Sequence, residues 1–237
     1  MTSALSVVIL AALVLSAVAF LVVSLRTERK RRAGYLAMAE RRAWDYEFVR
    51  ARGNRPAEVR FADPVSGIAL VVTRRLSRKS GSTTTTRGGA TVAHLREPRL
   101  AGGLAVYTPP LDKDLASAAT TMLGILDNSV GRFLVGRLLG EEFSQHVGQL
   151  VEQPVPAGAD VSILASVDPR PVVDARAMAR ALSVFPGDKA MAMVSDEGIR
   201  LRIGRALAEP EEIERLFDTA LALGRDLREG SPQRLSS

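Results

Sequence analysis

The chain has 237 residues, of which 46% are apolar and 24% charged, and it carries a net charge of +6. It contains no cysteine, which excludes disulfides, thiolate zinc sites and cysteine nucleophiles, and its two histidines leave little material for imidazole chemistry. The charge is uneven, because residues 26–110 are strongly basic whereas residues 111–237 carry an excess of acidic side chains. The two halves are therefore suited to different partners.

The first predicted element is a membrane-spanning helix over residues 4–25. This stretch carries no charge, and about 20 apolar residues in a helix cross a hydrocarbon core of about 30 Å. A cleavable signal peptide is the alternative, because Ala17-Val18-Ala19 has the form of a cleavage site. Signal peptides begin with basic residues and have a shorter apolar stretch. Here Met1-Thr2-Ser3 contains no basic residue, and the apolar run continues past Ala19. We therefore expect an uncleaved anchor.

Basic residues follow this helix directly and predict its orientation: Arg26, Arg29, Lys30, Arg31 and Arg32. By the positive-inside rule, the N-terminus lies outside and the C-terminal bulk lies in the cytoplasm. The same side chains would attract anionic lipid headgroups at about 1 kcal/mol each. A role in setting topology alone explains them equally well.

The residues after the anchor predict a helix and then a β-rich region. Residues 27–52 are rich in helix-forming side chains and lack proline, and Gly53-Asn54-Arg55-Pro56 would end that helix. Strands are expected at residues 68–75, 91–95 and 104–108. The polar residues 77–89 between them would form a flexible hairpin tip or a disordered loop. Their hydroxyls make phosphorylation an alternative to a plain solvated loop.

The apolar period becomes helical after residue 112, and a linker rich in proline and glycine follows at residues 153–158. The remainder alternates between strands and helices as β-α-β-β-α, so we expect an α+β fold. The expected parts are an anchor (1–26), a basic juxtamembrane helix and linker (27–56), a β-rich then helical lobe (57–152), an α+β lobe (153–230) and a disordered tail (231–237).

Four short motifs resemble those of a known class of protein: Arg42-Ala43-Trp44-Asp45-Tyr46, Gly67-Ile68-Ala69-Leu70, Gly102-Gly103-Leu104-Ala105-Val106 and Asp196-Glu197-Gly198-Ile199. The class is that of uncharacterised bacterial single-pass membrane proteins with a cytoplasmic α+β domain of unknown function. The resemblance implies this architecture. It implies no activity, ligand or site.

Candidate chemistry is sparse. Glu142 and His146 share one face of a predicted helix and could chelate a metal or pair as base and orienter, but two ligands do not make a site. His94 lies in a predicted strand and is best explained as structural. The glycines and threonines of residues 81–89 lack the spacing of a phosphate-binding loop. We expect no cofactor and no metal.

These observations favour a membrane-anchored cytoplasmic interaction or scaffold module without enzymatic activity. The cationic residues cluster beside the bilayer and stacking aromatics are few, which argues against nucleic-acid binding. The alternative is a membrane-tethered enzyme whose carboxylates and hydroxyls converge only in three dimensions. The sequence identifies no partner beyond the lipid bilayer.

Overall fold

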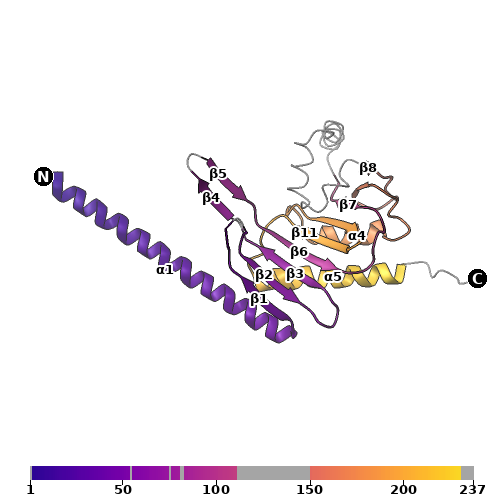
Figure 1. Ribbon diagram of the computed structural model, residues 1–237, viewed down its shortest axis with the longest axis horizontal. Helices are drawn as coiled ribbons and strands as arrows, with labels where there is room; N and C mark the ends of the chain where they lie inside the picture. The colour runs from indigo at the N-terminus through magenta and orange to yellow at the C-terminus, as the bar shows by residue number, and fades with distance from the viewer. Residues whose placement is uncertain (1, 54, 75, 81–82, 111–149, 231–237) are drawn as a thin grey trace, which may run out of the picture.

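Nine strands pair into one antiparallel sheet in the computed structural model, in the order β1-β2-β3-β6-β11-β10-β7-β9-β8 (Figure 1). The strands are β1 (Asp45–Val49), β2 (Glu58–Ala62), β3 (Ala69–Thr73), β6 (Ala90–Leu95), β7 (Ala105–Thr108), β8 (Val151–Glu152), β9 (Ser162–Ala165), β10 (Met191–Ser195) and β11 (Gly198–Ile203). A separate antiparallel hairpin consists of β4 (Leu76–Ser80) and β5 (Thr83–Arg87) and lies between β3 and β6 in the chain.

The structure describes residues 2–53, 55–74, 76–80, 83–110 and 150–230, and the side chains of 13–53, 55–74, 88–110 and 150–228. Within these ranges the expected α+β class is confirmed. The C-terminal β-α-β-β-α order is also found, as β9, α4 (Ala175–Ser183), β10, β11 and α5 (Pro210–Gly230).

Alternating apolar residues give the sheet one deeply buried face. In β3 and β6 every second side chain is buried, and the register places Val59, Val72, Thr91 and Ile203 in one row across four strands. Side chains opposite one another in antiparallel strands lie on the same face. The central strands β6 and β11 therefore contribute the middle of the core.

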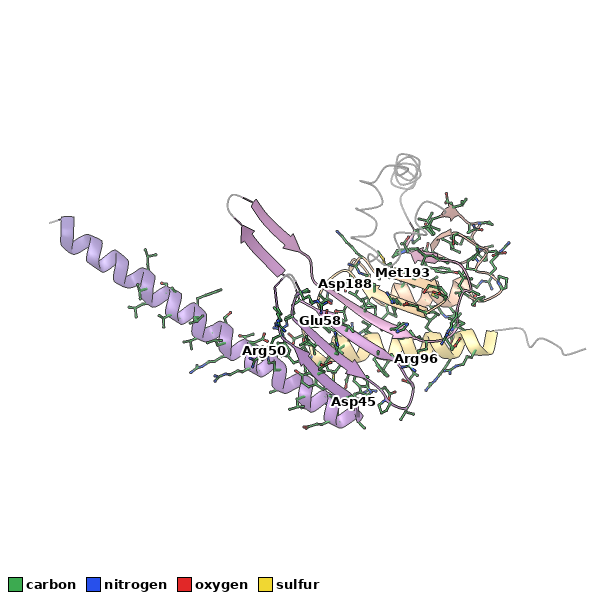
Figure 2. The ribbon with its side chains drawn as sticks, viewed as in Figure 1. Asp45, Arg50, Glu58, Arg96, Asp188 and Met193 are labelled. Carbon is green, nitrogen blue, oxygen red and sulfur yellow. The ribbon has the colours of Figure 1, made fainter. Side chains whose placement is uncertain are left out.

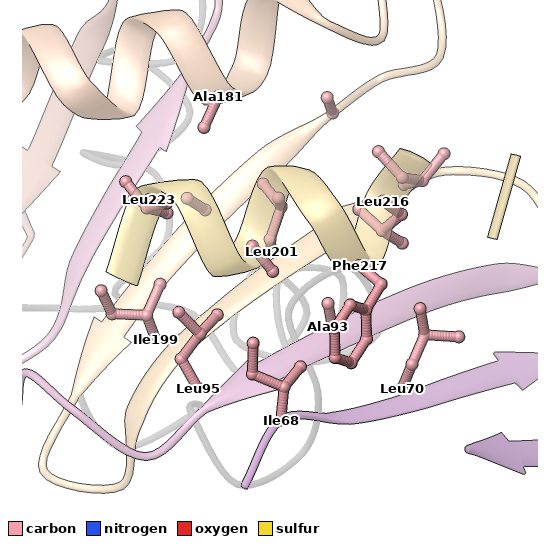
Figure 3. Packing of buried hydrophobic residues seen from close by; sticks show 14 of the residues in the cluster. Ile68, Leu70, Ala93, Leu95, Ala181, Ile199, Leu201, Leu216, Phe217 and Leu223 are labelled. Carbon is pink, nitrogen blue, oxygen red and sulfur yellow. The ribbon is translucent and has the colours of Figure 1, made fainter. Parts of the chain in front are cut away.

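Helices α4 and α5 cover this face. Leu216, Phe217 and Leu223 of α5 lie over Leu95 and Leu201 of the sheet (Figure 3). Helix α4 begins where the Asp174 side chain accepts a hydrogen bond from the backbone N–H of Arg176. Helix α5 begins with Pro210 followed by two acidic residues, as its sequence predicts.

Helix α1 (Thr2–Arg42) is one continuous element of 41 residues, about 60 Å long at 1.5 Å per residue. Its C-terminal part packs on the body through Tyr35, Met38 and Ala39, each 1% exposed. Its N-terminal half projects away from the body (Figure 1). Part of the expected span, residues 4–12, lies outside the described side chains. Among the residues described with their side chains, no helix is long and apolar enough to cross a membrane.

The helix expected over residues 27–52 ends earlier, at Arg42, and β1 takes its last residues. Ala43 adopts a left-handed conformation with φ of +54°, which closes the helix. After it, Tyr46 and Phe48 alternate toward the core like strand residues. Residues 77–89 were expected to be a flexible hairpin tip or a disordered loop, and of these, 77–80 and 83–87 belong to the paired strands β4 and β5. The helices expected within residues 112–149, and the tail after residue 230, lie outside the described residues.

Candidate functional site

An open groove with a volume of about 570 Å³ lies between α4 and α5. Its floor is apolar and includes Ala177, Ala181, Ala222 and Leu223. Most of the larger apolar residues of the two helices face the sheet, which leaves mainly alanines where the helices meet.

Charged side chains form the rim of the groove, and most are paired. Asp226 accepts a hydrogen bond from Nη2 of Arg180 at 2.6 Å, which joins α5 to α4. Glu214 accepts from Arg41 at 2.6 Å and from Arg42 at 3.2 Å, and Asp218 also accepts from Arg42. Three of the four acidic residues of the groove are therefore held by arginines, two of which belong to α1.

Two of the arginines also change the pKa of a groove carboxylate. Partial burial alone would raise the pKa of Glu214, but hydrogen bonds from Arg41 and Arg42 outweigh it and lower the pKa from its usual value. Asp226 raises the pKa of Arg180 by the same kind of bond. A carboxylate that two arginines hold in this way is poorly suited to proton transfer, whereas an open groove with an apolar floor suits contact with another surface.

A second, smaller hollow of about 310 Å³ lies where β7 and β9 meet the start of α4. Tyr107 lines it and is 1% exposed. Burial, together with the negative charges of Asp168 and Asp174, raises the pKa of its hydroxyl. Arg170, which also lines this hollow, donates hydrogen bonds to both carboxylate oxygens of Asp168. The hydroxyl is therefore neutral at physiological pH and can act as a hydrogen-bond donor.

Hydrogen bonds and a ring contact hold the joint between α1 and the body, beside the groove. The Tyr35 hydroxyl donates to the carbonyl oxygens of Leu207 and Ala208. Trp44 stacks on Phe217 of α5 with ring centroids 4.2 Å apart. Nη1 of Arg74 donates to both carboxylate oxygens of Glu28 at 2.6 Å. The joint therefore ties α1 to β3, to α5 and to the segment that precedes α5.

The residues singled out from the sequence do not build this groove. Glu142 and His146 lie outside the described residues. His94 lies on β6, where its Nε2 is 2.9 Å from the carbonyl oxygen of Glu197 in the β10–β11 turn. This contact gives His94 a structural role. Among the described residues, no group of three histidine, aspartate or glutamate side chains is close enough to hold a metal ion.

Sequence reasoning missed the role of Arg41 and Arg42. Both belong to the basic region that follows the predicted anchor, and in the structure they bind acidic residues of α5, which are far away in the chain. Glu211, Glu214 and Asp218 lie three or four residues apart, so their spacing places them on one side of α5. That acidic stripe could have been read from the sequence. Its arginine partners could not.

Comparisons with known proteins add little to this picture. No protein-family model matches the chain, and no curated protein is significantly similar to it. The crystal structure of the mycobacterial trehalose monomycolate transport factor A, TtfA, is similar at 9% sequence identity and a TM-score of 0.46, over 84% of this chain and 96% of that one. This likeness is too slight to bear on function, which therefore has to be inferred from the chain's own residues.

Proposed function

We propose that the protein is a membrane-anchored interaction module without enzymatic activity, whose body lies on the cytoplasmic side of a bacterial inner membrane. The observation that carries this proposal is the apolar surface of the projecting half of α1. Leu13, Val14 and Leu15 are consecutive and are 63%, 55% and 68% exposed. Successive helical residues point about 100° apart, so apolar side chains face outward on every side of this part of the helix.

Such a surface is unfavourable in water and favourable in lipid. Phe20 is 76% exposed and Val23 is 63% exposed, and the body does not cover either of them. Monomeric soluble proteins rarely leave contiguous apolar patches of this kind. Together with residues 4–12, which are equally apolar in sequence, this stretch has the length of a bilayer-spanning helix.

The cytoplasmic placement of the body is inferred from the charges that follow the apolar stretch. Arg26, Arg29 and Lys30 are exposed on α1 just before the helix meets the body. Basic residues beside a span remain on the cytoplasmic side of the membrane. The chain after them is then cytoplasmic as well.

The groove between α4 and α5 supports an interaction role for the body. It is open, its floor is apolar, and three of its four carboxylates are engaged by arginines. It borders Arg41 and Arg42 at the end of α1, so a protein bound there would lie close to the joint. We propose this groove as the partner-binding surface of the module.

Membrane retention and orientation provide the direct test. Val14→Arg with Val18→Arg places two charges in the proposed span, each costing about 2.5–3.5 kcal/mol at a helix centre, and should release the chain from membranes on alkaline extraction. Leu36→Arg with Ala37→Arg is the matched control, because these two residues are exposed on the docked part of α1. Equal retention of both variants would contradict the anchor.

A reporter that is active only in the cytoplasm, fused after Ser237, tests the orientation. It should give signal in the wild type and less signal once Arg29, Lys30, Arg31 and Arg32 are neutralised. A silent but stably produced fusion would contradict a cytoplasmic body.

The groove can be tested with a photo-crosslinking residue at Ala222, compared with the same residue at Ser66 in the β2–β3 turn. We expect a specific adduct from Ala222 that Thr219→Trp abolishes. Identical adducts from both positions would contradict a partner surface at the groove.

A further inference from the structure

One end of the sheet carries an unusual density of positive charge, and it is the end past which α1 leaves the body. Helix α1 runs antiparallel to β1. Its last residue, Arg42, lies shortly before the start of β1, whereas Arg32, ten residues earlier, lies over Phe48 near the end of that strand. Glu28 then contacts Arg74, just after the last residue of β3. The apolar half of α1 therefore continues beyond the β1–β2 connection and the β4–β5 hairpin.

Two connections at this end carry only positive charge. The described residues of 50–57 and 74–89 include seven basic and no acidic side chains: Arg50, Arg52, Arg55, Arg74, Arg78, Lys79 and Arg87. The other connections at this end, 184–190 and 204–209, add two basic and two acidic side chains. At the opposite end, the connections 63–68, 96–104 and 196–197 contain two basic and four acidic side chains. Figure 2 shows Arg50 beside α1 where the helix leaves the body, and Asp45 and Arg96 at the far end.

The β1–β2 connection brings like charges together without compensation. Arg52 and Arg55 form an isolated antiparallel bridge, with each backbone N–H donating to the other residue's carbonyl oxygen at 3.1 and 3.0 Å. Both side chains are exposed, and neither has an acidic partner among the described residues. Like charges placed opposite one another repel. An anionic surface outside the chain would relieve this repulsion.

The hairpin extends this cationic end further. Strands β4 and β5 pair over five residues each and lie beyond the ends of β3 and β6, outside the nine-stranded sheet. The hairpin points to the same side as the projecting half of α1 (Figure 1). Its base is held to α1 by the bond between Arg74 and Glu28.

We propose that this end, formed by residues 50–57 and 74–89, docks on anionic lipid headgroups and so fixes the orientation of the body against the membrane. The inference rests on the proposed membrane anchor and adds a second contact to it. Basic side chains near an anionic leaflet are attracted to it, and here they lie on two connections as well as on the juxtamembrane helix. The acidic end of the body is then directed away from the surface.

Site-specific labelling of the full chain tests the proposal. The chain lacks cysteine, so Ala51→Cys, Ser80→Cys and Ser66→Cys each accept one fluorophore, at the cationic end, at the last residue of β4 and at the opposite end. The labelled proteins are placed in vesicles of phosphatidylcholine alone or mixed with phosphatidylglycerol, with a quencher on the lipid headgroups. We expect quenching at residues 51 and 80 in the anionic vesicles only, and none at residue 66.

Charge removal provides the matched comparison. Replacing Arg50, Arg52 and Arg55 by glutamine should reduce the docking equilibrium on the order of 100-fold. Replacing Arg96, Arg99 and Arg225, which are exposed elsewhere, removes the same charge and should leave quenching unchanged. High salt should weaken docking of the unmodified chain, because exposed charges are screened.

The outcomes separate the two proposals. A chain that fails to float with either kind of vesicle contradicts the anchor. A chain that floats with both but shows no quenching at residues 51 and 80, or equal quenching at residue 66, overturns the docking proposal and leaves the anchor intact. Free inorganic phosphate should not reproduce the effect of phosphatidylglycerol, and if it does, the contact is with phosphate rather than with a lipid surface.

Discussion

The hydroxyl of Tyr35, on α1, lies 3.1 Å from the carbonyl oxygen of Leu207, and the two residues are 172 positions apart in the chain. Leu207 directly precedes the segment that leads into α5, and its backbone N–H donates to the hydroxyl of Thr91 on β6. These hydrogen bonds meet at Leu207 and link α1, the segment before α5 and the central sheet. The stability of the α1 joint is therefore coupled to that of the core.

Tyr35→Phe should lower the free energy of unfolding by about 1–2 kcal/mol, because buried carbonyl oxygens lose a donor. It should also change the dependence on pH. Burial raises the pKa of Tyr35 from 10 to about 12, so at high pH the unfolded chain ionises first. The wild type therefore loses stability as the pH rises from about 10 to 12, by on the order of 2 kcal/mol, and the variant should lose less. Chemical denaturation at a series of pH values measures both effects.

Glu28→Gln should loosen the base of the hairpin. The charge of Arg74 would be left without its partner, and its Nη2 is already buried without a hydrogen bond among the described residues. Burial would raise the pKa of Glu28, but bonds from Arg74 and Arg32 lower it overall. Its contribution to stability is therefore present above the usual pKa of 4.5 and is lost as the pH falls through the folded value.

Hydrogen exchange of the backbone amides of residues 73–76 measures this loosening. Exchange should be faster in Glu28→Gln than in Glu40→Gln, which removes an exposed carboxylate from the same helix. Equal exchange rates in the two variants would show that the bond to Arg74 does not hold the hairpin base.

Trp44 is the chain's single tryptophan, so its fluorescence reports on the docked end of α1. It is 7% exposed and contacts Phe61 and Phe217. Trp44→Ala should cost about 3–5 kcal/mol of stability, measured by circular dichroism, because a large cavity is left between α1, β2 and α5. Trp44→Phe keeps the stacking on Phe217 and should cost considerably less. Equal losses would mean that ring contacts contribute little.

Gly198 begins β11 with φ of +111°, and a Cβ atom added there would lie 2.1 Å from the carbonyl oxygen of Leu95. Gly198→Ala should therefore cost at least about 2 kcal/mol, since the backbone of β6 would have to move. Gly158 also has a positive φ, of +81°, but nothing lies within 4 Å of its added Cβ. Gly158→Ala should cost only about 1 kcal/mol. Urea denaturation of both variants distinguishes steric crowding from backbone strain.

Local patterns predicted much of the body. The strands predicted at residues 68–75, 91–95 and 104–108 correspond to β3, β6 and β7, and the predicted β-α-β-β-α order of the C-terminal part is found. The boundary between α1 and β1 was misplaced. Residues 43–52 contain alanine, glutamate and arginine, which favour a helix, whereas in the structure residues 45–49 pair with β2 and Tyr46 packs against Phe61.

The order of the strands and the contacts between α1 and the body could not be predicted from the sequence. Strand β11 pairs with β6, about a hundred residues earlier in the chain, and no local signal specifies that partner. The same holds for Arg42 and Asp218, whose pairing depends on the sheet bringing α1 beside α5. The charge of residues 50–57 and 74–89 was visible in the sequence. That both segments lie at one end of the sheet was not.

Helix α1 passes from its projecting half to its docked half as a single rigid rod, with no proline between Thr2 and Arg42 and with its last turns bonded to α5. A rigid helix transmits rotation along its length. A small rotation of the projecting half about its own axis would therefore move the distant strands β8 and β9 through a wide arc. A partner bound to the projecting half would thereby reorient the body without contacting it.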